Sequence, residues 1–244
     1  MGNYQGNYNV KVQDNSVAIV GWEEGTAGQI HSWLETTGEY HIACFINPSD
    51  QPIYVDPSNI ERDATKFDYP TNISFKDKPL INSANWLQAL KHLDIKYVLV
   101  TTPDPKQRFN QINQVREDKL KLINAIHPTA LIMEDAIIGD NVIMHARVFV
   151  GYRSEVFSGT IIDTNVQIDH HNVIKECVTL DPGVVTAGNV TIGRYTQVHT
   201  GTVIINRKRI GENSILGAGT VIIDDMPDNV TVVGVPGKII KHHE

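Results

Sequence analysis

The sequence is poor in cysteine, which excludes two classes of stabilised fold. Only Cys44 and Cys177 occur among 244 residues, far apart and without a second candidate ligand beside either. A disulfide framework needs paired cysteines, and a Cys-type zinc site needs clustered ones. We therefore expect no such scaffold and a reducing, cytoplasmic setting.

Blocks of positive charge and long apolar runs are also missing. The formal net charge is -7 and the sequence pI is about 5.8, so a nucleic acid or an anionic membrane is not an expected partner. No apolar run approaches the roughly 20 residues that span a bilayer. The polar start MGNYQGNYNVKVQDN has no apolar core of a signal peptide, so we expect a soluble, unexported protein.

A repeat of period six fills the second half of the chain. Every sixth residue from Ile126 is aliphatic, with Thr186 as the one exception: Ile126, Ile132, Ile138, Met144, Val150, Val156, Ile162, Ile168, Ile174, Leu180, Thr186, Ile192, Val198, Ile204, Ile210, Leu216 and Ile222. Four residues after each, the side chain is usually small or β-branched, with Asn172, Lys208 and Met226 as exceptions. A period of six fits neither an amphipathic helix nor a simple meander of alternating strands. It predicts a solenoid in which three hexapeptides make one triangular coil.

Glycine, Asn and Asp recur beside the aliphatic positions, as in Gly139-Asp140-Asn141 and Gly211-Glu212-Asn213. Corners need residues that tolerate unusual backbone angles. The whole pattern resembles the hexapeptide-repeat acyltransferases. That resemblance implies a left-handed parallel β-helix, a homotrimer with active sites between subunits, and acetyl-coenzyme A as the acyl donor.

The segment before the repeats alternates strands and helices. A buried-type strand at Val17–Val20 is followed by a helix with Ile30, Trp33 and Leu34 on one face, and by a strand at His41–Ile46. Further elements are expected at 86–93 (helix), 96–101 (strand) and 106–122 (helix), while 48–84 has no assignment. We therefore predict a small parallel, Rossmann-like α/β domain at 1–122 and a β-helix domain at 123–244.

This order of domains resembles the nucleotide-sugar N-acetyltransferases. The resemblance implies transfer of an acetyl group to a UDP- or GDP-linked amino sugar, such as a 4-amino-4,6-dideoxy sugar, for bacterial glycans including O-antigen. It places the nucleotide sugar on the first Gly-rich loop and the end of the second strand, here Gly21, Gly25, Thr26 and Asn47. Thr26 stands where the family commonly has His, and Asn47 where it commonly has an acidic residue. The loop spacing, GxxxGxxG, is also compatible with a purely structural turn.

Acetyl transfer from a thioester needs a base and a donor for the oxyanion. The family's catalytic histidine aligns with His170, in the hexad IDHHNV, and the usual acidic residue after it is replaced by His171, a secondary candidate. Gly188, in TAGNVTIG, is the oxyanion-donor candidate. His145 and His199 also lie on the repeats, and we assign them no chemistry.

The remaining acetyl-coenzyme A candidates follow from the same resemblance. They are Gly188 itself, small or hydroxyl residues on later coils, and the closing segment VVGVPGKII: Thr200, Gly201, Gly217, Ala218, Pro236 and Lys238. Ordinary corner geometry is the alternative explanation for the small residues. No Ser or Cys nucleophile with a paired base is evident, which favours direct transfer of the acetyl group.

Three other functions remain open. An O-acetyltransferase acting on a sugar or sialic acid would use the same base and donor. A γ-type carbonic anhydrase would need two zinc-binding histidines five residues apart, but Lys175 and Glu176 stand at that spacing from His170 and His171, so we predict no metal. A non-catalytic trimeric scaffold would leave Gly188, the VPGK segment and the α/β domain unexplained.

Overall fold

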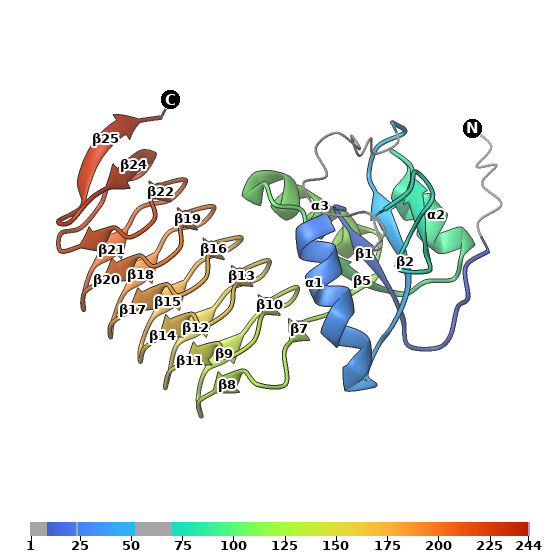
Figure 1. Ribbon diagram of the computed structural model, residues 1–244, viewed down its shortest axis with the longest axis horizontal. Helices are drawn as coiled ribbons and strands as arrows, with labels where there is room; N and C mark the ends of the chain where they lie inside the picture. Colours follow the sequence, from blue (N-terminus) through green and yellow to red (C-terminus); the bar gives the residue numbers. More distant parts are fainter. Residues whose placement is uncertain (1–8, 23, 52–69, 244) are drawn as a thin grey trace, which may run out of the picture. The chain divides into compact units, whose positions relative to one another are not determined.

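The computed structural model describes residues 9–22, 24–51 and 70–243. Contacts divide the chain into two compact units: Met1–Pro103 with Gln111–Ile123, and Asp104–Asn110 with Asn124–Glu244. Both are drawn in Figure 1. Residues 104–110, which contain the start of helix α3 (Pro105–Glu117), therefore group with the repeats.

The first unit is built on a six-stranded sheet with the order β3-β4-β2-β1-β5-β6. Its parallel strands are β1 (Ser16–Val20), β2 (His41–Asn47), β4 (Lys78–Asn82), β5 (Tyr97–Val100) and β6 (Lys121–Leu122). The short β3 (Ser74–Phe75) runs antiparallel to β4. The predicted small parallel sheet is therefore confirmed, with one added hairpin at its edge. Strands β3 and β4 come from the stretch that the sequence left unassigned, of which residues 52–69 lie outside the described part.

Within the described residues, three α-helices accompany the strands: α1 (Glu24–Leu34), α2 (Trp86–His92) and α3 (Pro105–Glu117), with a 3-10 turn at Glu35–Thr37. The predicted apolar face of α1 is confirmed, because Ile30, Trp33 and Leu34 are all buried. The prediction that the last helix continues to Leu122 is wrong. Lys119 takes a left-handed φ of +59°, and the bonds from Lys119 N to Arg116 O and from Leu120 N to Val115 O close the helix end.

The second unit is a parallel β-helix, as predicted (Figure 1). Successive two-residue strands fall on three sheets in turn, which we call sides one, two and three. Side one contains β7 (Ala125–Ile126), β10 (Ile143–Met144), β13 (Ile161–Ile162), β16 (Thr179–Leu180), β19 (Gln197–Val198) and β22 (Ile215–Leu216), followed by β24 (Val230–Val233) and β25 (Lys238–His242). Side two contains β8 (Leu131–Ile132), β11 (Phe149–Val150), β14 (Gln167–Ile168), β17 (Val185–Thr186), β20 (Val203–Ile204) and β23 (Val221–Ile222). Side three contains β9 (Ile137–Ile138), β12 (Glu155–Val156), β15 (Val173–Ile174), β18 (Thr191–Ile192) and β21 (Arg209–Ile210).

The aliphatic column of the sequence forms the core of this unit. The second residue of every strand from β7 to β23 belongs to the column, and from Met144 onward each of these side chains is buried. Corner residues repeatedly take a left-handed φ, including Asn141 at +54°, Asn165 at +61° and Asn189 at +61°. Asn adopts this conformation more readily than most residues, which explains its recurrence at the corners.

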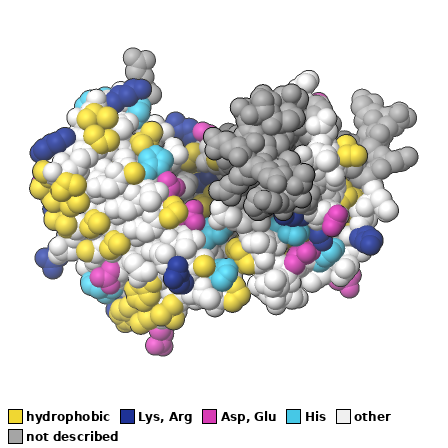
Figure 2. Space-filling view, viewed as in Figure 1, with side chains coloured by type: hydrophobic (Ala, Val, Ile, Leu, Met, Phe, Trp, Pro, Cys, Tyr) yellow, Lys and Arg dark blue, Asp and Glu magenta, His cyan; other side chains and the backbone are white. Residues whose placement is uncertain are grey.

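The outward face of side two is unusually apolar for a surface. Leu131 on β8, Val185 on β17 and Val203 on β20 point outward and are 57%, 38% and 37% exposed. Figure 2, which shows one face of the molecule, has hydrophobic side chains at the surface of the repeat unit. Exposed apolar side chains that gather on one face can mark an interaction surface.

Arg108, on α3, is the largest fully buried side chain of the described residues. Its Nε donates to Gly159 O at 2.8 Å, and its Nη2 donates to Cys177 O at 2.9 Å and to Thr179 Oγ1 at 3.0 Å. These bonds join the first turns of α3 to two successive coils of the β-helix. Among the described helices, none is long and apolar enough to cross a membrane.

Candidate active site

His170 lies at the corner between sides two and three, directly after β14. Its backbone N donates to Asp169 Oδ1 at 2.7 Å, and its ring is exposed. The ring Nδ1 lies 3.0 Å from the Nδ1 of His171. Only one of these nitrogens can carry the shared proton when both rings are neutral. If His170 is the donor, its Nε2 is left unprotonated and able to accept a proton.

The backbone of His171 makes this pairing possible. His171 has a left-handed φ of +57°, and its N donates to Tyr152 O at 2.9 Å. The His171 ring meets the Tyr152 ring edge-on, with centroids 5.8 Å apart. This arrangement turns the His171 ring toward His170 and holds it there. The residue that replaces the family's acidic neighbour thus supplies a hydrogen-bond partner for the His170 ring.

Gly188 lies under the His170 imidazole, one coil later. A Cβ added at position 188 would come within 2.4 Å of His170 Cε1 and 2.5 Å of Nε2. A side chain at this position would therefore displace the ring. The structure brings these two predicted residues into direct contact.

Two buried polar side chains beside this corner were not among the predicted site residues. Asn172 Nδ2 donates to Asp169 O at 2.5 Å and to Ala187 O at 3.1 Å, and Ser154 Oγ donates to Asp169 O at 2.7 Å. The sequence carried a signal for Asn172, because it interrupts the run of small or β-branched side chains at the fourth position after the aliphatic column. Ser154 carried none, since serine fits that run.

The structure places four acetyl-coenzyme A candidates at a different corner of the β-helix. Thr200 and Gly201 follow β19, and Gly217 and Ala218 follow β22, all between sides one and two. Gly219 N donates to Thr200 O at 2.9 Å, which stacks the two turns. Within one chain, these residues and His170 lie at opposite ends of the side-two strands.

The two candidates in the closing segment lie at the hairpin of β24 and β25. Lys238 is the first residue of β25, pairs with Val233 and is exposed. Pro236 lies in the turn between the two strands and is also exposed. Both side chains are therefore accessible to a ligand.

The candidate residues of the first unit gather at the carboxyl ends of its parallel strands, where ligands bind in open α/β sheets. Gly21 follows β1 with φ +86°, and a Cβ there would lie 1.8 Å from Thr102 Oγ1. Packing alone therefore requires glycine at this position. Gly25 and Thr26 lie in the first turn of α1, where a Cβ on Gly25 would meet open space.

Asn47 ends β2 and is held by a second asparagine that the sequence did not single out. Asn47 Nδ2 donates to Asn82 Oδ1 at 2.8 Å and to Gln51 O at 2.9 Å. Asn82 ends the neighbouring strand β4 and donates from its own Nδ2 to Asn72 O at 2.8 Å. Asn82 escaped notice because β4 lies in the stretch that the sequence left unassigned.

The other histidines of the repeats differ in environment. His145 is buried, and this burial lowers the pKa of its imidazole, partly offset by the carboxylate of Asp163. His199 Nδ1 lies 2.7 Å from Asp181 Oδ2, so the ring of His199 has a carboxylate partner, whereas the ring of His170 pairs with His171. No group of three or more His, Cys, Asp and Glu side chains suited to a metal ion occurs in the described part of the chain.

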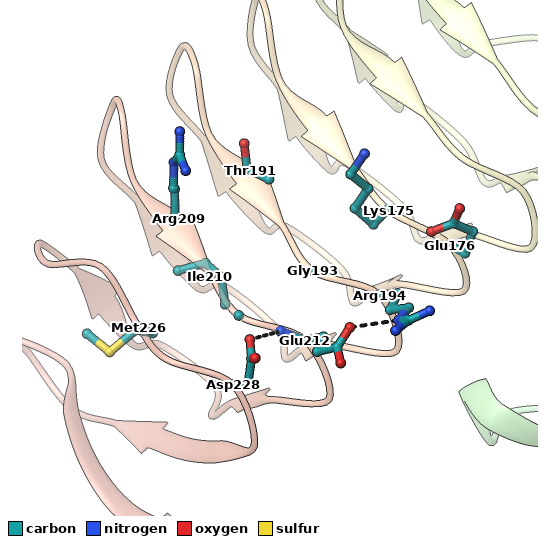
Figure 3. Close-up of a pocket in the computed structure, with 11 residues that line it drawn as sticks. Lys175, Glu176, Thr191, Gly193, Arg194, Arg209, Ile210, Glu212, Met226 and Asp228 are labelled. Atoms are coloured by element: carbon teal, nitrogen blue, oxygen red, sulfur yellow. Dashed lines mark hydrogen bonds and ion pairs between the residues drawn. The ribbon is translucent and has the colours of Figure 1, made fainter.

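A cleft of about 560 Å³ opens along side three and its corner with side one. Figure 3 shows Glu212 between Arg194 and Asp228, with Lys175 and Arg209 extending from the strand side. Arg194 Nε lies 2.6 Å from Glu212 Oε2, and Glu212 N donates to Asp228 Oδ1 at 2.8 Å. None of the residues predicted from sequence lines this cleft. We favour the His170 corner as the reactive site. In the cleft, the charged groups of Arg194 and Glu212 already pair with each other, and among its lining residues no candidate base lies beside a candidate oxyanion donor.

Comparisons with known proteins agree with this architecture. Serine acetyltransferase of Buchnera aphidicola (Acyrthosiphon pisum) is 28% identical over 114 residues, which is 40% of this chain and 42% of that protein. Galactoside O-acetyltransferase of Escherichia coli is 29% identical over 128 residues, which is 43% of this chain and 63% of that protein. The chain thus spans less than half the length of the first of these relatives. No family model matches the sequence.

Among solved structures, PerB from Caulobacter crescentus, in complex with CoA and GDP-perosamine, has a TM-score of 0.81 and 25% identity, covering 95% of this chain and 100% of that one. The acetyltransferase domain of PglB from Neisseria gonorrhoeae has a TM-score of 0.79 and 24% identity, covering 93% and 100%. The chain is therefore similar to hexapeptide-repeat acyltransferases in sequence and in fold. The predicted resemblance to nucleotide-sugar N-acetyltransferases is confirmed over nearly its whole length.

Proposed function

We propose that this protein is an acetyl-coenzyme A-dependent N-acetyltransferase that acts in the cytoplasm on the amino group of a nucleotide-linked amino sugar. The observation that carries the proposal is the contact between His170 and Gly188, a base and a backbone donor on adjacent coils. The likeness to PerB over 95% of the chain supports the acceptor class, because that enzyme was solved with CoA and GDP-perosamine.

His170 is the general base in this proposal. In the tautomer that the proposal requires, His170 Nδ1–H donates to His171 Nδ1, 3.0 Å away, and Nε2 is left to take a proton from the attacking amine. His171 therefore does the orienting work that a carboxylate does in other acid–base pairs. A neutral partner stabilises the protonated imidazole less than a carboxylate does, so the orientation of the ring is its main contribution.

Gly188 N–H is the donor that stabilises the tetrahedral oxyanion. Within the described residues its N–H has no acceptor, while Gly188 O accepts from Arg207 N at 3.0 Å. A backbone donor held in this way needs no reorganisation when negative charge develops on the thioester oxygen. The amine nitrogen bonds to the acetyl carbon, the carbon–sulfur bond breaks, and coenzyme A leaves as the thiol without an acyl-enzyme intermediate.

A homotrimer explains why the candidate residues occupy two corners. The pantetheine arm would pass from Gly188 on one chain to Thr200 and Ala218 on the next, while Pro236 and Lys238 would meet the adenosine end. The apolar face of side two, with Leu131, Val185 and Val203, supplies a surface for packing between chains. In this assembly the reactive corner is only half formed by one chain.

The first unit would hold the nucleotide sugar at the carboxyl ends of β1, β2 and β4. The start of α1, with Gly25 and Thr26, presents backbone N–H groups that suit a phosphate. Asn47 stands where the family commonly has an acidic residue. The Asn47 and Asn82 amides together provide donors and acceptors for ribose or base without a negative charge. Two neutral amides can bind ligand groups that accept hydrogen bonds as well as groups that donate them, whereas an ionised carboxylate binds only donors.

The direct test is acetyl-coenzyme A turnover, followed as thiol release, against a panel of UDP-, GDP- and dTDP-linked amino sugars, with matched hydroxyl sugars beside them. We expect an amino sugar to be accepted and its N-acetyl product to be identified by NMR. The repeats also match serine and galactoside O-acetyltransferases, so an O-acetyltransferase is the second candidate. Turnover of hydroxyl acceptors alone would establish that alternative and overturn ours.

A further inference from the structure

Polar side chains at the corners of the β-helix link successive coils in a repeated pattern. Asn124 Nδ2 donates to Gly139 O, 15 residues on, at 2.8 Å, and Asn124 Oδ1 accepts from Val142 N, 18 residues on, at 2.9 Å. Thr196 makes the same pair with one hydroxyl, donating to Gly211 O at 2.8 Å and accepting from Ser214 N at 3.2 Å. An inward polar residue thus bridges its own corner to the corner stacked on it.

Asn172 follows this pattern at the reactive corner and adds a bond to it. Its Nδ2 donates to Ala187 O at 3.1 Å and its Oδ1 accepts from Val190 N at 3.0 Å. The same Nδ2 also donates to Asp169 O at 2.5 Å, in its own coil. The side chain is fully buried. One amide therefore bonds to the residues that directly precede His170 and Gly188.

Because the peptide bond is planar, the hydrogen bonds of Asn172 to Asp169 O and Ala187 O also fix the orientation of the residues that follow, His170 and Gly188. In a trans peptide the C=O and the following N–H point in opposite directions. Because Ala187 O is drawn inward to Asn172, the N–H of Gly188 is turned outward. Asp169 O is fixed in the same way, which sets the direction in which the chain enters His170.

We propose that Asn172 is a positioning residue that holds the His170 base and the Gly188 donor in one fixed geometry. The inference rests on the proposed function, since it assigns to Asn172 the alignment that acetyl transfer requires. Asn172 does not reach the surface, so its effect is exerted through the two corners alone. Loss of alignment lowers the rate of the chemical step more than it lowers ligand affinity.

The test compares Asn172→Val with Asn124→Val. Valine already occupies the same column position one hexad away on either side, at Val166 and Val178, so it fills the space without the bonds. Asn124 makes the same bridge where no site residue lies, which makes it the matched control. We expect Asn172→Val to lower kcat by about 10²-fold with little change in KM for acetyl-coenzyme A, and Asn124→Val to keep the wild-type kcat.

Asn172→Thr provides a conservative rescue. Thr196 shows that one hydroxyl makes both bonds to the next coil, so the threonine variant should recover most of the lost kcat. Equal kcat in folded Asn172→Val and Asn124→Val would overturn the inference. If Asn172→Val does not fold, a threonine variant about 10²-fold slower than wild type would overturn it, and near-wild-type turnover would support it.

If the wild-type protein transfers no acetyl group, the proposed function is wrong, but the positioning role of Asn172 can still be tested by a separate measurement. Carbethoxylation of His170 by diethylpyrocarbonate, followed by mass spectrometry, reports the freedom of the imidazole without any acceptor. We then expect faster modification in the Asn172 variant than in wild type or Asn124→Val. Equal rates in the three proteins would overturn the positioning role.

Discussion

The imidazole of His170 rests on the backbone of Gly188, so closely that a Cβ at 188 would lie 2.4 Å from His170 Cε1. The atoms in the way belong to a side chain at the surface, which can swing aside without disturbing the core. Gly188→Ala should therefore fold normally and still lower kcat by about 10²-fold, because the base is displaced. Thermal melting and steady-state kinetics measure the two effects separately.

A double mutant tests whether this loss passes through His170. Once the imidazole is removed, the added methyl group has nothing to displace, so His170→Ala combined with Gly188→Ala should be about as slow as His170→Ala alone. Residues that contact one another are expected to be non-additive in this way. Multiplicative losses would show that Gly188 acts independently of the ring.

We expect Arg108 to contribute to the stability of the protein rather than to catalysis. Burial lowers the pKa of its guanidinium, partly offset by the nearby Cys177 and Asp104, and its bonds to Gly159 O and Cys177 O would be lost in Arg108→Met. Because both buried carbonyls lose the hydrogen bond that Arg108 donates, we expect the free energy of unfolding to fall by about 2–4 kcal/mol. Urea denaturation measures this change.

Arg116→Met is the matched control for Arg108, since Arg116 is exposed on the same helix. Surface substitutions of this kind usually change stability by less than about 0.5 kcal/mol. Equal losses in the two variants would mean that the buried hydrogen bonds of Arg108 contribute little.

Glu35 gives the first unit a pH-dependent contribution to stability. Burial raises the pKa of its carboxyl, but the hydrogen bonds from Lys78 Nζ at 2.8 Å and Ile42 N at 3.0 Å, together with His41, bring it below the ordinary value of 4.5. A lowered folded-state pKa stabilises the protein above the unfolded-state pKa, and this contribution is lost as the pH falls through the folded-state value. Glu35→Gln should therefore melt below wild type at pH 7, and the difference should close as the pH falls below 4.5.

The same pH series on Glu117→Gln, at the exposed end of α3, controls for the general effect of losing a carboxylate. A difference between wild type and Glu35→Gln that stays constant down to strongly acidic pH would contradict an ionised, hydrogen-bonded Glu35.

The repeats could be predicted because an aliphatic residue recurs at every sixth position from Ile126, except at Thr186. Each coil repeats the same aliphatic positions, so the column from Ile126 to Ile222 specifies strands, corners and core together. The end of α3 was not predictable in this way. Its residues continue a helical pattern up to Leu122, and only the left-handed Lys119 ends the helix.

The candidate site was predictable where it depended on one hexad and not where it depended on stacking. His170 and Gly188 stand out within their own segments. The contact of Asn172 with Ala187 and the pair formed by His199 and Asp181 arise because residues 15 or 18 positions apart meet on adjacent coils. Asn82 was missed for another reason, since its strand begins with Lys78-Pro79 and lacks the apolar run of a buried strand.

His170 is the proposed base, although His199 has a carboxylate partner, Asp181, at 2.7 Å. The most direct measurement is kcat for acetyl transfer to an accepted amino sugar in His170→Ala, His171→Ala and His199→Ala. We predict a loss of about 10²–10⁴-fold for His170→Ala, a smaller loss for His171→Ala, and near-wild-type turnover for His199→Ala. Collapse in His199→Ala with turnover retained in His170→Ala would contradict the account and move the reactive site to the corner between sides one and two.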